Sequence, residues 1–316
     1  MRFSVVLPTY NRAHLLERSV RSVLNQSFSD FELIIVDDNS TDDTEDYINS
    51  IDDSRIIYIR HNKNKGPAAA RNSGILNSKA NFIAFQDSDD EWHKDKLQVF
   101  YDKFVNVIGL EYGLAYSRRS FIALGSKKLY YPPSWLPKKD GNVFEELLLR
   151  NFIDTPAAVV KRECFNKVGF FDEELSCLED YDLFLRISKY YKVLYLDETL
   201  LISHATSGGV NSADFSVHAS IHLKIFQKHI HDYDINSSII CSKYISIGDY
   251  YSLGNEYNSA RIFFRKAIDI NKTNIATLVL YFASLGEQYF IKGIYKFCRK
   301  LILKIKLIFS LRPELF

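Results

Sequence analysis

Short apolar runs alternate with helix-like segments over residues 3–90, and this alternation restricts the fold more than any other feature. The apolar runs lie at 3–7, 31–36, 55–60 and 81–85. Helical spacing of apolar residues and helix-start signals predict helices over 12–25, 39–50 and 67–78. Nearly continuous apolar strands that alternate with helices are typical of a parallel sheet covered by helices on both faces. The sequence therefore predicts an α/β fold of the Rossmann-like type.

Polar residues stand where each predicted strand ends. The pairs are Thr9 and Tyr10, Asp37 and Asp38, His61 and Asn62, and Asp87 and Asp89. In open α/β sheets, ligands bind beyond the carboxyl ends of the strands. We therefore expect a binding site at this edge.

The segment QDSDDEW at 86–92 carries Asp87, Asp89 and Asp90 directly after an apolar strand. Clustered carboxylates repel one another unless a cation lies among them. In an extended chain, Asp87 and Asp89 face the same side, so both can face one ion. Mg²⁺ or Mn²⁺, held by one or two carboxylates and substrate phosphates, fits this pattern. The alternative is an acidic N-terminus of a helix that starts near Lys94.

The remainder of the chain predicts a mixed region and then a helical one. Strands are expected at 112–124, 128–131, 155–161 and 193–196, an irregular loop at 131–137, and helices at 141–150 and 177–191. Residues 248–273 resemble a single tetratricopeptide-like helical pair. We therefore expect an α/β domain over 1–212 and a helical region over 213–316.

Residues 288–310 have the pattern of an amphipathic helix. Their Lys and Arg side chains fall within an arc of about 160°, and the opposite arc is apolar. One interpretation is a helix lying on an anionic membrane surface. The other is a terminal helix that docks its apolar side on the protein core.

Composition narrows the functional classes. The net charge of +1, from 40 basic and 39 acidic residues, argues against nucleic acid as a partner. The four cysteines are scattered without a CxxC pair, as expected for thiols in a reducing compartment. The sequence shows no signal peptide and no apolar run of about 18 residues. These features predict a cytoplasmic protein, peripheral at the inner face of the membrane if 288–310 binds there.

Five segments resemble motifs of glycosyltransferase family 2, the inverting enzymes of the GT-A fold, and they occur in the family's order. They are VVLPTYNR (5–12), LNQSFSDFELIIVDDNSTDDT (24–44), GPAAARNSGI (66–75), AFQDSDDEWHKDKL (84–97) and LEDYDLFLR (178–186). The resemblance implies a nucleotide-sugar donor, most often UDP-linked, a divalent cation (Mn²⁺ or Mg²⁺), and a glycan or lipid-linked acceptor. Surface-polysaccharide synthesis in bacteria is the expected setting.

The resemblance also implies roles for individual positions. The nucleotide-sugar would be bound by Pro8, Thr9, Tyr10, Arg12, Asp37, Asp38, Arg71, Asp87 and Ser88. Among these, Asp38 would contact the uracil or ribose, Asp87 the ribose, and Arg71 the base or diphosphate. Metal binding would fall to Asp89, helped by Asp90 and His204. Trp92 would pack beneath the acidic loop and face the acceptor.

Asp180 matches the family's catalytic base, with Glu179 beside it. For Asp180 the alternative is helix capping, and for His204 it is a structural role. His93 stands where the family commonly has proline, and no QxxRW motif of processive synthases is present. We therefore expect addition of one sugar or a few.

Two other functions are weighed against this one. A nucleotidyltransferase also uses such a sheet and a carboxylate-held Mg²⁺, but PTYNR offers no glycine-rich phosphate loop. A non-catalytic scaffold or glycan-binding module would depend on the helical C-terminal region instead.

Overall fold

The computed structural model describes residues 2–105, 109, 111–131, 139–206, 214–230, 235–272 and 274–284. The chain divides into two compact units, Met1–Gly209 and Val210–Phe316, which are described separately. The amphipathic segment 288–310, the loop over 132–137 and the turn at 207–209 lie outside the described residues. The predicted division into a catalytic domain over 1–212 and a helical region over 213–316 stays a prediction.

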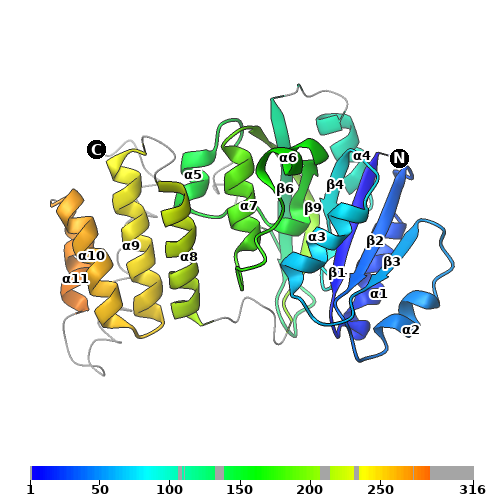
Figure 1. The fold of residues 1–316 in the computed structure, drawn as a ribbon, viewed down its shortest axis with the longest axis horizontal. Coiled ribbons are helices and arrows are strands. Elements are labelled where there is room, and N and C mark those ends of the chain that lie inside the picture. Colours follow the sequence, from blue (N-terminus) through cyan, green and yellow to red (C-terminus); the bar gives the residue numbers. More distant parts are fainter. Residues whose placement is uncertain are drawn as a thin grey trace. The chain divides into compact units, whose positions relative to one another are not determined.

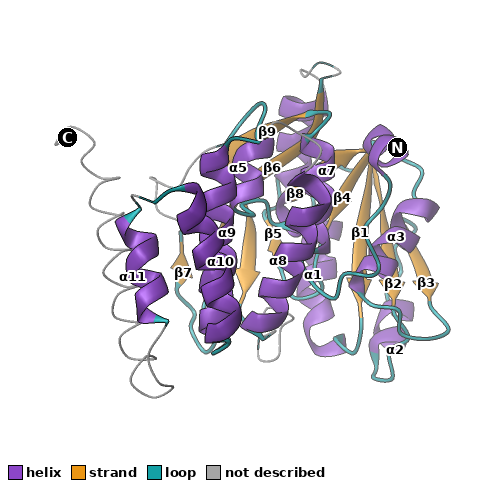
Figure 2. Cartoon of the chain, turned by 60° about the vertical axis from the view of Figure 1, so that its left-hand side comes forward, coloured by secondary structure: helices purple, strands orange, loops and turns teal. Residues whose placement is uncertain are grey.

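The first unit is an α/β structure (Figures 1 and 2). Its strands are β1 (Phe3–Thr9), β2 (Phe31–Asp37), β3 (Ile56–Arg60), β4 (Phe82–Phe85), β5 (Glu91–Trp92), β6 (Tyr112–Ile122), β7 (Leu129–Tyr130), β8 (Ala158–Lys161) and β9 (Lys192–His204). Its helices are α1 (Ala13–Leu24), α2 (Thr44–Asn49), α3 (Pro67–Asn77), α4 (Lys96–Phe100), α5 (Phe144–Leu149), α6 (Arg162–Val168) and α7 (Glu179–Ser188). A π-helical turn follows α4 at Tyr101–Val105, and a 3₁₀ turn precedes β8 at Thr155–Ala157.

The described strands form a nine-stranded sheet in the order β3-β2-β1-β4-β8-β6-β9-β5, with β7 paired to β6. Strands β1 to β4 are parallel, as the alternation predicted. Strand β8 is antiparallel to both β4 and β6, and β9 is parallel to β6. Strands β6 and β9 therefore run in the same direction as β4. The carboxyl ends of β1, β2, β4, β6 and β9 all lie at one edge, where β8 begins.

Helices cover both faces of the sheet because the buried strands are apolar on both sides. On one face, Leu33 and Ile35 of β2 join a core cluster with α1. On the other face, Ile34 and Val36 pack against Ala70 of α3. Helix α3 lies so close to β1 that a Cβ on Gly74 would stand 2.3 Å from a methyl carbon of Val6. This close approach requires glycine at that position.

The expected elements are present with shifted bounds where local chemistry intervenes. The strand expected at 155–161 begins as a 3₁₀ turn, since Pro156 has no N–H for a sheet ladder. The strand expected at 193–196 is part of the longer β9. The helix expected over 39–50 begins only at Thr44. Before it, the Asp37 side chain accepts a hydrogen bond from the Ser40 N–H, and the Asp42 side chain accepts one from the Thr44 N–H, which holds the preceding residues in a loop.

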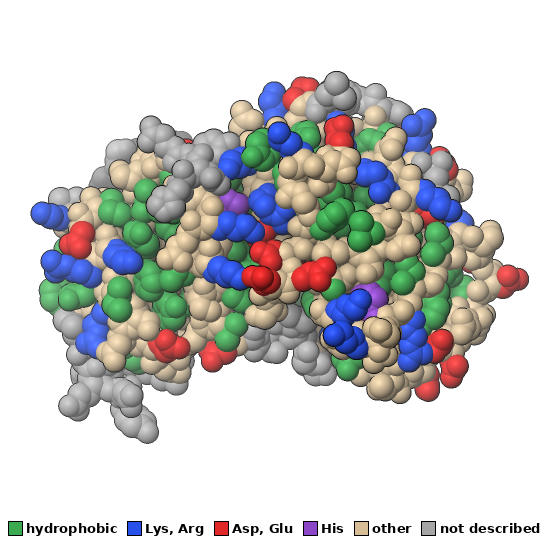
Figure 3. Space-filling model, viewed as in Figure 1, with side chains coloured by type: hydrophobic (Ala, Val, Ile, Leu, Met, Phe, Trp, Pro, Cys, Tyr) green, Lys and Arg blue, Asp and Glu red, His purple; other side chains and the backbone are tan. Residues whose placement is uncertain are grey.

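The second unit contains α8 (Phe215–Ile230), α9 (Ser237–Leu253), α10 (Tyr257–Ile270) and α11 (Ile275–Ala283). Helices α9 and α10 form the expected helical pair, but α9 begins earlier than predicted. A Cβ on Gly248 would stand 2.6 Å from the ring of Phe264, so the two helices approach closely there. None of the described helices is long and apolar enough to cross a membrane. On the face in Figure 3, basic and acidic side chains are interspersed.

Candidate active site

Arg71, on α3, joins the two acidic regions that the sequence singled out. Its guanidinium donates hydrogen bonds to Asp87 at 2.9 Å and to Glu179 at 2.6 Å. Burial works against the charged form, but both carboxylates raise the pKa of Arg71 above its ordinary value. The loop after β4 and the start of α7 therefore meet at the Arg71 guanidinium.

Asp180 lies in the first turn of α7 beside this bridge. One carboxylate oxygen accepts a hydrogen bond from the Thr155 hydroxyl at 2.8 Å, and the other from the Tyr181 N–H at 2.6 Å. Burial and the neighbouring charge of Glu179 raise the pKa of Asp180 to about 7, while Thr155 and Arg71 act in the opposite direction. A carboxylate with such a pKa can take up a proton near neutral pH.

The acidic loop carries its three aspartates in different surroundings. Asp89 accepts hydrogen bonds from Arg12 at 2.8 Å and from Thr206 at 3.2 Å, both through Oδ2. Asp90 accepts from the Ser203 hydroxyl and from the His204 N–H, at the end of β9. Burial, together with the charges of Asp87 and Asp89, raises the pKa of Asp90 to about 8. Burial is the largest cause that raises the pKa of Asp87, and the neighbouring charge of Asp89 adds to it.

The predicted metal ligands do not converge on one point. The His204 ring faces Glu91, with 3.2 Å between Nε2 and Oε2, and burial lowers the pKa of His204. Within the described residues, no three His, Cys, Asp or Glu side chains form a cluster able to hold a metal ion. Asp89 keeps Oδ1 without a protein partner among these residues. Carboxylates that repel one another, one of which has an oxygen left for a ligand, suit a hard divalent cation such as Mg²⁺ or Mn²⁺. Substrate phosphates would supply its remaining ligands.

Asp37 and Asp38 direct their carboxylates at the chain itself. Asp37 accepts hydrogen bonds from the Ser40 N–H and the Tyr58 hydroxyl. Asp38 accepts from the N–H groups of Lys65 and Gly66 and contacts His61 Nδ1 at 2.7 Å. Gly66, at φ +90°, takes a conformation that favours glycine where this loop enters α3. Asp38 therefore shapes the loop that leads into α3 and Arg71, whereas Asp37 holds the loop after β2.

The residues at the carboxyl end of β1 and Ser88 of the acidic loop differ in how far their side chains are exposed. Thr9 is 3% exposed, and its hydroxyl has no hydrogen-bond partner among the described residues, although a buried hydroxyl normally has one. Tyr10, in contrast, is 45% exposed. Pro8 and Ser88 are each partly exposed. Tyr10, Pro8 and Ser88 can meet a ligand, whereas the Thr9 hydroxyl is buried. The predicted nucleotide contacts of all four residues stay predictions.

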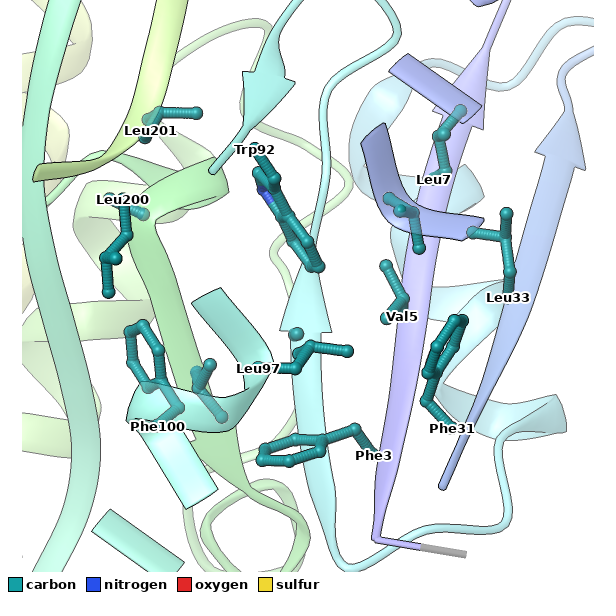
Figure 4. Packing of buried hydrophobic residues seen from close by; sticks show 14 of the residues in the cluster. Phe3, Val5, Leu7, Phe31, Leu33, Trp92, Leu97, Phe100, Leu200 and Leu201 are labelled. Atoms are coloured by element: carbon teal, nitrogen blue, oxygen red, sulfur yellow. The ribbon is translucent and has the colours of Figure 1, made fainter. Parts of the chain in front are cut away.

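Trp92 packs in the core beneath the acidic loop, near Leu97 (Figure 4). It is 3% exposed, and its indole N–H donates to the Pro156 carbonyl at 3.2 Å. The ammonium of Lys96 donates to the same carbonyl and lies 3.8 Å from the centre of the Trp92 ring. So little exposed surface suits a role in holding Pro156, and with it Thr155, better than contact with an acceptor.

Thr155 and Lys96 were not among the residues predicted from the sequence, and neither were Arg119 and Asp154. Arg119 and Asp154 form an ion pair at 3.0 Å. A lysine within the apolar period of α4 was the available signal for Lys96, which is fully buried. Nothing in the sequence pattern indicated Thr155.

Comparison with known proteins identifies the family. Residues 4–169 match the model of glycosyl transferase family 2. A putative colanic acid biosynthesis glycosyl transferase of *Escherichia coli* K12, WcaA, is 30% identical over 239 residues, which cover 73% of this chain and 82% of WcaA. WfaP of *Escherichia coli*, named UDP-Glc:alpha-D-GlcNAc-diphosphoundecaprenol beta-1,3-glucosyltransferase, is 40% identical over 124 residues, which cover 39% of this chain and 49% of WfaP. The chain spans 34% of an uncharacterized glycosyltransferase of *Rickettsia felis*, with 35% identity over 67% of this chain.

Solved structures share the fold. *Staphylococcus aureus* TarS 1-349 in complex with UDP-GlcNAc has a TM-score of 0.66 at 18% identity, covering 95% of this chain and 92% of that one. The mannosyltransferase PcManGT of *Pyrobaculum calidifontis*, in complex with GDP-Man and Mn²⁺, has a TM-score of 0.61 at 17% identity, covering 99% of this chain and 88% of that one. The first unit has the GT-A fold, and the chain is a glycosyltransferase that belongs to glycosyltransferase family 2.

Proposed function

We propose that this enzyme transfers one sugar, with inversion, from a UDP-linked donor to a hydroxyl of a lipid-linked surface glycan. Asp180 is the general base, and a divalent cation binds beside Asp89. The observation that carries the proposal is the bridge of Arg71 between Asp87 and Glu179. It links the loop suited to a diphosphate with the helix that carries a carboxylate of raised pKa.

The residues divide the chemistry between the two faces of the reacting sugar. The acceptor oxygen forms a bond to the anomeric carbon while the bond from that carbon to the diphosphate oxygen breaks. Asp180 takes the proton of the acceptor hydroxyl, and the nucleoside diphosphate departs with the bonding electron pair. The anomeric carbon carries oxocarbenium-like charge in the transition state, as in glycoside hydrolysis. Inversion requires the base on the face opposite the leaving group.

On the donor side, Asp87 contacts the ribose and Arg71 contributes positive charge near the diphosphate. Asp89, with Asp90 behind it, holds the cation, which supplies charge to the leaving diphosphate when it is bound. Asp90 mainly holds the acidic loop against the end of β9, because its two carboxylate oxygens already accept hydrogen bonds from Ser203 and His204. Tyr10, which is exposed at the carboxyl end of β1, contacts the nucleotide.

The donor and acceptor classes rest on relatives. WfaP uses UDP-glucose and a diphosphoundecaprenol-linked acceptor according to its name. WcaA is named for colanic acid biosynthesis. A polyprenol-linked acceptor would bring this enzyme to the cytoplasmic face of a membrane, and we infer a peripheral location there.

The test is transfer with Asp180→Asn. Loss of the general base is expected to lower kcat by about 10²–10⁴-fold. UDP binding, measured by calorimetry, should stay unchanged, because Asp180 acts on the acceptor. The matched control is Asp52→Asn, an exposed carboxylate, which should keep full activity. Full transfer activity in Asp180→Asn would refute the assigned mechanism.

A further inference from the structure

The hairpin of β6 and β7 presents two aromatic rings to solvent. Phe121 is 46% exposed and Tyr130 is 40% exposed. Their ring centroids lie 5.2 Å apart with an interplanar angle of 25°, so the rings are stacked on one another. We call this pair the hairpin platform. Contiguous exposed apolar surface is typical of interaction sites, and Leu124 and Tyr131 of the same hairpin are exposed as well.

The hairpin platform lies at the ligand edge of the sheet. Strand β6 runs in the same direction as β4, so its carboxyl end is at the edge that carries the acidic loop. Phe121 pairs with Ser203 of β9. The Ser203 hydroxyl in turn donates a hydrogen bond of 3.1 Å to Asp90. One strand therefore separates the platform from the acidic loop.

The ion pair of Arg119 and Asp154 connects the hairpin platform to the proposed base. Residues 119–122 of β6 pair with 201–204 in unbroken register, so Arg119 and Phe121 project from the same face, about 7 Å apart along the strand. Asp154 immediately precedes Thr155, whose hydroxyl donates to Asp180. Burial raises the pKa of Asp154, Arg119 opposes the shift, and the charge of Asp87 adds to it. Asp154 is thus the chain neighbour of the residue that contacts the proposed base.

A sugar ring matches this arrangement. A pyranose has an apolar face of C–H bonds and a rim of hydroxyl groups. Tyr130 covers one face of the Phe121 ring, so the apolar surface that the hairpin platform offers is the other face of Phe121. The neighbouring pair offers a carboxylate that accepts and a guanidinium that donates hydrogen bonds. Lys128, whose ammonium lies 5.5 Å from the centre of the Tyr130 ring, adds positive charge that suits a phosphate-linked sugar.

We propose that the hairpin platform and the Arg119–Asp154 pair form the acceptor subsite, which binds the terminal pyranose of the acceptor glycan and orients its hydroxyl toward Asp180. This inference rests on the proposed function, because it takes Asp180 as the base. It commits to a carbohydrate occupant, since the apolar surface continues into an ion pair and then into the proposed catalytic site.

The test measures acceptor binding separately from donor binding. The probes are methyl glycosides of glucose, galactose, mannose and N-acetylglucosamine, added with UDP and Mn²⁺ and followed by saturation-transfer NMR. We expect saturation of one or more glycosides by the wild-type chain, and a signal about five- to tenfold weaker for Phe121→Ala. Asp154→Asn should change which glycoside is preferred. The control is Tyr190→Ala, a 53% exposed aromatic just beyond the carboxyl end of α7.

Calorimetry with UDP separates the two proposals. If UDP binds and Phe121→Ala still binds the glycosides like the wild type, the acceptor subsite is refuted while the proposed function stands. Failure of UDP to bind the wild-type chain would refute the proposed function itself. The hairpin platform would instead be a lipid contact if Phe121→Ala lost binding to vesicles containing phosphatidylglycerol and kept glycoside binding. That result also overturns the inference.

Discussion

Asp87 and Glu179 accept hydrogen bonds from two nitrogens of a single guanidinium, that of Arg71. The two carboxylates belong to segments far apart in the chain, and the cation between them offsets their repulsion. Removing one partner of a buried charge network usually costs more than the pair contributes, because a buried charge is left uncompensated. Arg71 therefore positions both acidic regions.

Replacing Arg71 by lysine tests this bridge. A lysine ammonium is a point charge without the planar fork that reaches both carboxylates. We expect Arg71→Lys to lower transfer activity about a hundredfold, as expected when catalytic groups are misplaced. Arg55→Lys is the control, because Arg55 pairs with Asp53 in a separate ion pair. Equal activities of Arg71→Lys and the wild type would contradict the bridging role.

The pH profile of transfer follows from Asp180. Its carboxyl must be ionised to take a proton, and its pKa is raised to about 7. The rate at limiting acceptor should therefore fall about tenfold for each pH unit below about 7. Glu179→Gln removes a neighbouring negative charge that raises this pKa, so the acidic limb should move to lower pH. A limb that stays in place in Glu179→Gln would exclude this coupling.

The raised pKa of Asp180 also makes the stability of the fold depend on pH. Low pH favours stability, whereas high pH favours transfer. Folding raises the pKa of Asp180 from 3.8 to about 7, so the folded chain binds this proton more tightly than the unfolded chain. Its contribution to the free energy of unfolding is fully present below pH 3.8 and is lost as pH rises through about 7. Asp180→Asn should flatten the dependence of stability on pH in that window, as measured by urea unfolding. An unchanged dependence would contradict the shift.

The sequence was sufficient to predict the parallel half of the sheet, because apolar runs and strand-end polar residues are local signals. It was insufficient for Thr155, since the contact with Asp180 depends on how the turn before β8 packs against α7. Strand β8 also inserts between β4 and β6, an order that no local pattern encodes. Asp38 was predicted to bind nucleotide, and its observed bonds to the loop before α3 likewise arise from the fold.

Metal dependence can be tested at Asp89. EDTA is expected to abolish transfer, and added Mn²⁺ or Mg²⁺ should restore it. Asp89→Asn should weaken Mn²⁺ binding in the presence of UDP by at least about 10–100-fold, the loss caused by removing even an outer-shell partner of a metal ligand. Calorimetry or electron paramagnetic resonance measures that binding without relying on activity, and Asp52→Asn serves as the control. Transfer that persists fully in EDTA would exclude a catalytic cation.

Gly74 tests the packing that fixes Arg71 in place. A Cβ at this position would stand 2.3 Å from a methyl carbon of the fully buried Val6, so α3 or β1 must shift to accept alanine. Overpacking of this kind costs about 1–3 kcal/mol, and Gly74→Ala should lower the free energy of unfolding by that amount. Val6→Ala removes the two methyl groups involved and creates a cavity by itself. The double variant should therefore be less destabilised than the sum of the two single variants, as measured by urea unfolding. Additive losses would show that α3 does not depend on this contact, and the position of Arg71 would then need another explanation.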